Sequence, residues 1–155
     1  IKKINYDKNG DFSLKGKTNN KVLNDLKKDL YFKKKFPKSL DRNYFSINSV
    51  LKLDFYDACA TLSAFTAYSI IDELNKFEIK NIVLSGGGIR NKFILNLLKE
   101  SFGDKLVSID EKYGNSKFIE SQAFAYLGIR RVKNLPISFP STTGVKIPVT
   151  GGKIA

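Results

Sequence analysis

Apolar positions along the chain change their spacing near residue 81, where a short hydrophobic run meets three glycines. Ile82, Val83 and Leu84 form a run without polar alternation, which is typical of a strand covered on both faces of a parallel sheet. After the glycines, apolar residues recur at helical spacing until a glycine that can end a helix in the left-handed conformation. These residues are Phe93, Ile94, Leu97, Leu98, Phe102 and Gly103. The pattern predicts a strand, a tight turn and a helix that begins near Asn91.

The segments before this unit predict two helices. Asn19 or Asn20 can cap a helix over residues 21–29, in which apolar side chains stack at every fourth position. A long helix is expected from Asp54, which can act as its cap, to about Asn75. The stacked residues of the first helix are Val22, Leu26 and Leu30, and the apolar stripe of the second consists of Ala58, Leu62, Phe65, Ser69 and residues 70–74.

The segments after this unit predict a further strand and a further helix. Residues 106–109 form a second apolar run, expected to be a buried strand, and residues 110–115 are expected to be a polar loop. Ser116 can cap a helix over residues 117–133. Prolines and a glycine break the remainder into turns, and residues 145–149 are expected to add an edge strand.

The length of the chain and its apolar runs limit the classes of protein to which it can belong. At 155 residues the chain is long enough for one domain with a hydrophobic core. No apolar run approaches the about 18 residues of a membrane-spanning helix, and no secretory leader is recognisable, so we expect a cytoplasmic protein. The chain starts at Ile1 and contains no methionine, so it is interpreted as an N-terminally incomplete fragment.

The residue types that are missing exclude several chemistries. Histidine is absent and Cys59 is the single cysteine, which excludes internal disulfides, zinc clusters and any catalysis that depends on histidine. Cys59 lies among alanines and is expected to be a small buried apolar residue rather than a reactive thiol. No metal site is predicted within the chain.

The net charge of +12 raises the question of nucleic-acid binding. Residues 1–50 carry 13 Lys and Arg against 5 Asp and Glu, and residues 51–155 carry 14 against 10. Of the 27 basic residues 23 are lysine, rather than the arginine that suits phosphate and base recognition. We therefore interpret the excess as solvated lysines and expect no nucleic-acid partner.

Aromatic and basic residues alternate in the segment Leu30–Ser46. Such a segment can stack bases, or it can be a loop that packs its aromatic side chains on the core and leaves its lysines in water. We favour the loop.

The three glycines Gly86, Gly87 and Gly88 remove side chains at the carboxyl end of a strand, where open α/β sheets bind ligands. Free N–H groups and the positive end of the following helix attract anionic or polar groups such as those of a nucleotide. A turn that only permits close packing explains the glycines equally well. The spacing matches neither the dinucleotide-binding nor the phosphate-loop motif.

The residues around the glycines resemble a known enzyme family. The strand that ends in glycines is similar to the adenosine motif of the actin, hexokinase and Hsp70 ATPase superfamily. Three segments, SGGGIRN at 85–91, ESQAFAYLGIR at 120–130 and LPISFPSTTG at 135–144, resemble in order and spacing the C-terminal half of the anhydro-N-acetylmuramic acid kinases. The segment 37–45 also resembles that family's PKSTGRExF run, with Leu40-Asp41-Arg42-Asn43 differing in part.

The resemblance implies a fold class and an organisation of the chain. It implies an α/β fold that forms the C-terminal lobe of an actin-like, ribonuclease H-like ATPase, with an incomplete, mostly parallel sheet flanked by helices. Residues 1–155 would be that lobe, divided into a lysine-rich connecting and helical segment over 1–50 and an α/β core and tail over 51–155. The N-terminal lobe would be a separate part, and the family also implies a homodimer.

The resemblance further implies an activity. The family uses ATP, Mg²⁺ and water to open 1,6-anhydro-N-acetylmuramic acid and phosphorylate it to N-acetylmuramic acid 6-phosphate, a step of cell-wall recycling. By resemblance, Gly86–Gly88 and Asn91 would bind the nucleotide and Glu120 would face the amino sugar. From its position alone, Glu120 is expected to complement a helix dipole at the surface, and the resemblance reverses this interpretation. No catalytic base is assigned within the chain, since the family's aspartate belongs to the N-terminal part.

Two alternatives from other classes remain open. One is a catalytically silent nucleotide-binding or scaffold protein of the same superfamily. The other is a basic nucleic-acid binder, which predicts association that weakens strongly with salt.

Overall fold

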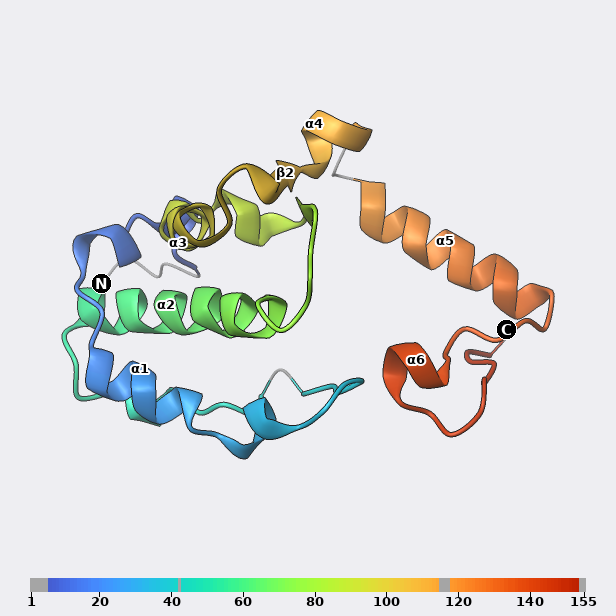
Figure 1. The fold of residues 1–155 in the computed structure, drawn as a ribbon, viewed down its shortest axis with the longest axis horizontal. Helices are drawn as coiled ribbons and strands as arrows, with labels where there is room; N and C mark the ends of the chain where they lie inside the picture. The colour runs from blue at the N-terminus through green and yellow to red at the C-terminus, as the bar shows by residue number, and fades with distance from the viewer. Residues whose placement is uncertain (1–5, 42, 115–117, 154–155) are drawn as a thin grey trace. The chain divides into compact units, whose positions relative to one another are not determined.

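The computed structural model describes residues 6–41, 43–114 and 118–153, and the chain forms two compact units. The first unit combines residues 1–29 with 46–116, and the second combines residues 30–45 with 117–155. The first unit is an α/β structure, with a two-stranded parallel sheet flanked by helices (Figure 1). The expected segments 1–50 and 51–155 stay a prediction.

The predicted strand, turn and helix are confirmed. Strand β1, Ile82–Leu84, pairs in parallel with β2, Leu106–Ser108, so that Val83 lies opposite Val107. Between them run a 3₁₀ turn, η5, over Gly87–Arg90 and helix α3 over Lys92–Phe102, which ends at Gly103 with φ 52°. The expectation of a strand covered on both faces is not met by the described residues, because Val83 is 38% exposed. Ile82 and Leu84, which point to the opposite face, are partly buried, so the described residues cover one face of this strand better than the other.

Helix α2, Phe55–Leu74, forms where the long helix was predicted, and the Asp54 carboxylate caps it by accepting a hydrogen bond from the Tyr56 N–H at 2.9 Å. Its predicted apolar stripe is largely wrong. The buried positions are Ala60, Thr61, Ala64, Phe65, Ala67 and Ile71. The small side chains face inward because α2 is contacted by α1, by α3 and by the short 3₁₀ helix η2, Ser13–Lys15, and alanines let these elements approach closely.

Helix α1, Asn20–Lys27, is capped by Asn19, whose side chain accepts from the Val22 N–H at 3.1 Å. The predicted stack is corrected at its end. Leu30 lies beyond the helix and is 69% exposed, whereas Leu23 is the buried side chain. The helix is too short to carry an i+8 position.

Residues 109–113 form a helical turn, α4 over Ile109–Tyr113, and not the predicted polar loop. The Ser108 side chain accepts from the Asp110 N–H at 3.3 Å, and the Glu111 side chain accepts from the Ser108 N–H at 3.3 Å. This is the reciprocal capping box that a Ser-x-x-Glu sequence specifies. The charged composition of the segment concealed that signal.

The second unit contains helix α5, Ile119–Val132, and the short helix α6, Pro140–Thr143. The predicted cap Ser116 lies outside the described residues, as does Arg42. The expected edge strand at 145–149 is reduced to one antiparallel bridge between Ser138 and Val149. The remaining 3₁₀ helices of the chain are η1 Lys8–Gly10, η3 Leu30–Lys33, η4 Ile47–Ser49 and η6 Gly103–Lys105.

The aromatic side chains of the segment 30–45 pack against one another rather than on a core. Phe36 is 52% exposed, and the Lys38 ammonium lies over the rings of Tyr31, Phe32 and Phe36, 4.6 to 5.8 Å from their centroids. Phe32 stacks on Phe45 with centroids 6.0 Å apart. Lys33, Lys34 and Lys35 are exposed as expected, whereas Lys38 lies over aromatic rings. None of the described helices is long and apolar enough to cross a membrane.

Candidate functional site

The glycine turn combines one strained residue with two open ones. Gly86 has φ 86°, a conformation that side chains disfavour, so the backbone itself requires glycine there. Gly87 and Gly88 do not have such a positive φ, and, as at Gly86, no described atom outside the adjacent residues lies within 4 Å of the position that a Cβ would take. Packing against the described residues therefore does not explain why these two positions lack a side chain.

Asn91 joins this turn to α3. Its side-chain oxygen accepts a hydrogen bond from the Ile94 N–H at 3.1 Å, and its backbone N–H donates to the Gly88 carbonyl at 3.0 Å. The side chain therefore caps the helix, as an N-cap asparagine does. One of the four N–H groups that a helix start leaves without a helical partner is thus satisfied.

A hollow of about 380 Å³ lies beside the turn. Gly87, Arg90 and Asn91 form one side of it, and the segment Tyr6–Asn9 forms the other. Lys8 and Arg90 are exposed at its edge, so two positive charges accompany the positive end of the α3 dipole. The combination suits a ligand that carries polar or anionic groups.

Asp7 is the acidic residue in this lining, and both of its oxygens are engaged. Oδ1 accepts from the Phe12 N–H at 2.8 Å, while Oδ2 accepts from the Ser13 N–H at 3.0 Å and from the Ser13 hydroxyl at 2.6 Å. Partial burial raises the pKa of Asp7, but the bonds from Ser13 and Phe12 outweigh it, and the net pKa lies below the ordinary value of 3.8. The carboxylate is therefore ionised and serves as an anchor.

Cys59 lies near this anchor. Its carbonyl oxygen is 3.2 Å from the Ser13 hydroxyl oxygen, which also lies 2.8 Å from the Ser63 hydroxyl oxygen. Burial, and after it the negative charge of Asp7, raises the pKa of the Cys59 thiol. The thiol is therefore protonated at neutral pH, in agreement with the expectation of an unreactive side chain.

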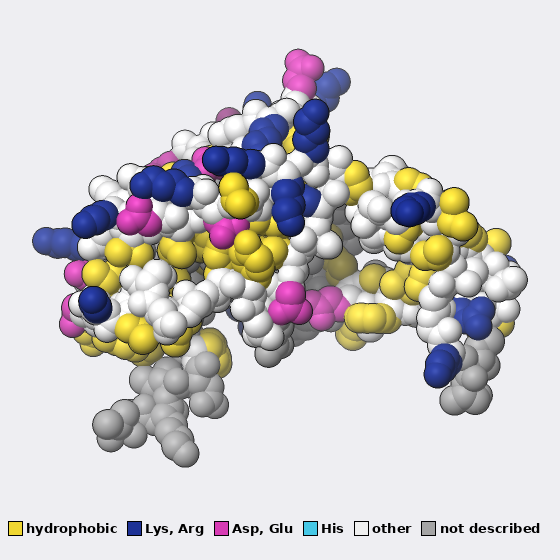
Figure 2. Space-filling model, turned by 90° about the horizontal axis from the view of Figure 1, so that it is seen from below, with side chains coloured by type: hydrophobic (Ala, Val, Ile, Leu, Met, Phe, Trp, Pro, Cys, Tyr) yellow, Lys and Arg dark blue, Asp and Glu magenta, His cyan; other side chains and the backbone are white. Residues whose placement is uncertain are grey.

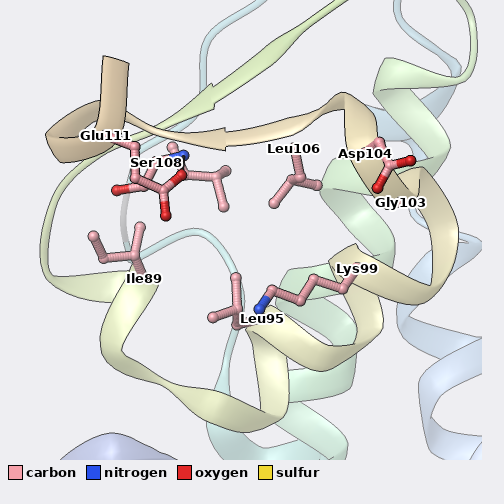
Figure 3. A pocket seen from close by; sticks show the side chains of 9 residues that line it. Ile89, Leu95, Lys99, Gly103, Asp104, Leu106, Ser108 and Glu111 are labelled. Atoms are coloured by element: carbon pink, nitrogen blue, oxygen red, sulfur yellow. Dashed lines mark hydrogen bonds between the residues drawn. The ribbon is translucent and has the colours of Figure 1, made fainter. Parts of the chain in front are cut away.

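A larger cavity of about 580 Å³ lies between α3 and the two strands (Figure 3). Ile89 and Leu95 face Leu106 and Ser108 across it. Its floor is apolar, and charged side chains come from Lys99, Asp104 and Glu111. Since Ile89 belongs to η5, the turn borders both cavities.

Glu120 lies in the first turn of α5 and is exposed. It belongs to the second unit, whereas Gly86, Gly87, Gly88 and Asn91 belong to the first. The structure brings those four together at the turn. The role of Glu120 toward an amino sugar stays a prediction.

Sequence reasoning missed the segment 7–10, which it interpreted as connecting structure. Asn9-Gly10 is a turn dipeptide, and both residues are in the left-handed region, with φ 57° and 78°. The dipeptide predicts a turn, but it does not predict that the turn lies beside Asn91. The contact between Gly10 and Asn91 spans 81 residues and could not be inferred from local pattern.

The distribution of charge and of oxygen ligands is also informative. Figure 2 shows Lys and Arg side chains dispersed over the visible face, with Asp and Glu side chains between them. Among the described residues, no three His, Cys, Asp or Glu side chains lie close enough together to hold a metal ion. Asp7 uses both oxygens within the protein. These residues therefore do not fit a Mg²⁺ site, and no chemical step is derived through one.

The family of this chain follows from its similarity to known proteins. The family model for anhydro-N-acetylmuramic acid kinase matches residues 1–155. This chain belongs to the anhydro-N-acetylmuramic acid kinase family. The resemblance drawn from the three motifs is thereby confirmed.

Curated relatives support the family membership and show how much of the protein is present. The anhydro-N-acetylmuramic acid kinase of Zymomonas mobilis is 39% identical over 153 residues, which are 97% of this chain and 42% of the relative. That of Methylobacterium nodulans is 40% identical over 152 residues, or 97% of this chain and 41% of the relative. That of Caldanaerobacter subterraneus is 36% identical over 168 residues, or 99% and 42%. The chain thus spans about two fifths of the length of these kinases.

Replacing Asp7 by asparagine tests the anchor. The folded pKa is below that of the unfolded chain, so the stabilisation is complete above about pH 4 and is lost as pH falls through the folded pKa. Asp7→Asn should lower the free energy of unfolding by about 1–2 kcal/mol at pH 7, as expected for hydrogen bonds to a partly exposed charge. The difference from the original protein should shrink towards pH 3 in urea unfolding.

Asp11→Asn is the matched control, because Asp11 is an exposed residue of the same segment. A difference that stays constant from pH 7 to pH 3 would contradict the assignment of Asp7 as an ionised anchor.

Proposed function

We propose that the protein containing this chain is an ATP-dependent kinase that hydrolytically opens 1,6-anhydro-N-acetylmuramic acid and phosphorylates it to N-acetylmuramic acid 6-phosphate. The observation that carries the proposal is the family match over all 155 residues, together with the open glycine turn at the start of α3. The proposed setting is the recycling of cell-wall sugars in the cytoplasm.

The glycine turn is the proposed nucleotide site. Gly87 and Gly88 leave free space above the backbone, so a flat or polar group can approach the main chain. The N–H groups at the α3 start and the helix dipole favour a polar or anionic ligand. Asn91 fixes the direction of that helix start by capping it. Gly86, Gly87, Gly88 and Asn91 are thus proposed to hold the adenosine side of ATP.

The fold proposed for the complete protein is an actin-like ATPase, of which this chain forms the C-terminal lobe. The parallel pair β1–β2 and its helices support an α/β lobe of that kind. Parallel sheets usually contain four or more strands, so further strands would come from the remaining three fifths of the family's length. A homodimer is part of the same proposal, and a nucleic-acid partner is not.

The chemistry divides between this chain and the rest of the protein. Water attacks the anomeric carbon, the bond from that carbon to O6 breaks, and O6 accepts the γ-phosphoryl group of ATP. The general-base aspartate is proposed to lie in the N-terminal lobe. This chain would position the nucleotide through the glycine turn and contact the sugar through Glu120. Mg²⁺ is proposed as a cofactor that accompanies ATP, with no ligand from the described residues of this chain.

The activity is tested with a chimera that joins this chain to the N-terminal part of the Zymomonas mobilis relative. ADP release should occur with 1,6-anhydro-N-acetylmuramic acid and not with glucose or glycerol. ADP release with another sugar would contradict the proposed substrate. ATP binding without ADP release would favour a nucleotide-dependent scaffold.

Glu120→Ala tests the proposed sugar contact in the same chimera. Loss of a charged hydrogen bond to the sugar should lower kcat/KM by about tenfold to a hundredfold, equivalent to about 1.5–3 kcal/mol. The KM for ATP should not change. Glu100→Ala is a matched control, since Glu100 is an exposed helical glutamate of α3. Equal effects of the two changes would remove Glu120 from the sugar site.

Gly87→Asp tests the nucleotide site. The new side chain would place a charged carboxylate in the free space at the turn, where the adenosine side of ATP is proposed to lie, so ATP binding should be abolished. Gly87→Ala is the steric control, because its methyl group meets no described atom within 4 Å and should weaken binding far less. Isothermal titration with a non-hydrolysable ATP analogue measures both. Unchanged affinity in Gly87→Asp would remove the turn from the proposal.

A further inference from the structure

We infer that residues 7–16, here called the strut, position the nucleotide turn, with Gly10 and Asp7 as positioning residues. The strut runs from the cavity beside the glycine turn to the N-terminal half of α2. This inference rests on the proposed function of the turn. It adds a mechanical element that neither the glycine motif nor the family match assigns.

Gly10 is the point at which the strut meets the turn. It is buried, with φ 78°, and a Cβ placed on it would collide with the Asn91 side-chain oxygen and approach the Phe93 N–H nitrogen to 3.2 Å. That asparagine oxygen is the one that caps α3. The strut backbone therefore sets how far the cap, and with it the helix start, can move.

The opposite end of the strut is fixed to α2 by buried polar bonds. Ser13 has no exposed surface, and its hydroxyl oxygen contacts Asp7, the Ser63 hydroxyl and the Cys59 carbonyl. Gly16 lies so close to α2 that a Cβ there would collide with the Tyr56 carbonyl. These contacts hold the strut at a defined distance from α2.

Two further bonds continue the attachment beyond the strut. The Lys17 N–H donates to the Asp57 carboxylate at 2.7 Å, and the Asn19 N–H donates to the buried Thr61 hydroxyl at 2.9 Å. Thr61 in turn donates to the Asp57 carbonyl at 2.7 Å. The segment is thus joined to the first three turns of α2 by successive hydrogen bonds.

The strut also forms one wall of the cavity beside the turn. Asp7, Lys8 and Asn9 line it from the strut side, and Gly87 and Asn91 line it from the turn side. A shift of the strut therefore changes the width of this cavity as well as the position of the α3 start. Both effects should appear in the affinity for the nucleotide rather than in the chemical step.

The two glycines at the ends of the strut provide a matched pair of variants. Gly10→Ala pushes on the cap of α3, and Gly16→Ala pushes on the backbone of α2. Both should destabilise the protein, because each added methyl group collides with neighbouring atoms. Gly10→Ala acts on the α3 cap directly, whereas Gly16→Ala reaches the nucleotide turn only along the strut and should affect it less. Stability and nucleotide affinity can therefore be separated within one segment.

The first experiment measures steady-state kinetics in the chimera described above. Gly10→Ala should raise the KM for ATP about tenfold, which corresponds to about 1.4 kcal/mol. Its KM for the sugar should stay within about twofold, which corresponds to about 0.4 kcal/mol. Gly16→Ala displaces the far end of the strut and should raise the KM for ATP about threefold, less than Gly10→Ala does. Equal changes of the KM for ATP in the two variants would overturn the inference.

A double variant tests whether Gly10 acts through Asn91. Asn91→Ser keeps a capping oxygen on a shorter side chain and so makes room for a methyl group at position 10. In the Asn91→Ser background, Gly10→Ala should therefore lower the ATP affinity less than it does in the original chimera. Additive losses would show that the two positions are not coupled and would overturn the inference.

Asp7→Asn is the milder variant if Gly10→Ala does not fold. It weakens the bonds from Phe12 and Ser13 within the strut, and so loosens Ser13, which contacts α2, while the Gly10 contact stays intact. The KM for ATP should therefore rise about threefold, which is less than the tenfold rise expected for Gly10→Ala. Asp11→Asn, the exposed control in the same segment, should leave the KM unchanged. An unchanged KM in Asp7→Asn would overturn the role of the anchor.

Hydrogen exchange separates this inference from the proposed function. In the ligand-free chimera, Gly10→Ala should speed amide exchange at residues 93–95, in the first turn of α3, and Gly16→Ala should speed it less. That readout needs neither ATP nor activity. Unchanged amide exchange in Gly10→Ala would overturn the inferred role of the strut. Failure of the original chimera to bind ATP would overturn only the proposed function.

Discussion

The buried hydroxyl of Ser13 is the contact on which the first unit depends. A buried hydroxyl without partners is costly, and this one has an ionised carboxylate, a second hydroxyl and a backbone carbonyl within hydrogen-bond distance. These partners come from Asp7, Ser63 and Cys59, so one side chain joins the strut to the middle of α2. Neighbouring polar contacts at Lys17 and Asn19 extend the same attachment. An irregular segment thereby becomes a fixed part of the unit.

The glycine turn depends on this attachment indirectly, through Gly10 and the α3 cap. The parallel pair β1–β2 sets where the turn begins, and the α3 cap sets where it ends. Gly10 then touches that cap from the strut side. The turn is therefore bounded by a sheet, a helix and an anchored loop, and its open face is left to a ligand. Such pre-organisation is what a binding site made mainly of backbone requires.

The elements of regular structure could be predicted where the signal was local. The apolar run at 82–84, the cap Asp54, the helix start near Asn91 and the stop at Gly103 each depend on a few neighbouring residues, and each was predicted. The buried face of α2 was not, because alanines at a helix contact resemble neutral surface positions until their partners are known. The site showed the same division, since the glycines were evident from sequence but their neighbour Gly10 depends on a contact across 81 residues.

The three glycines of the turn face different requirements, and this has an evolutionary consequence. Gly86 is needed by the backbone conformation itself, whether or not a ligand is present. Gly87 and Gly88 have room for a side chain among the described residues, so the reason to retain glycine there is the proposed nucleotide and not the backbone. If that proposal holds, a lineage that gave up the nucleotide but kept the fold would lose the second and third glycines first and keep the first.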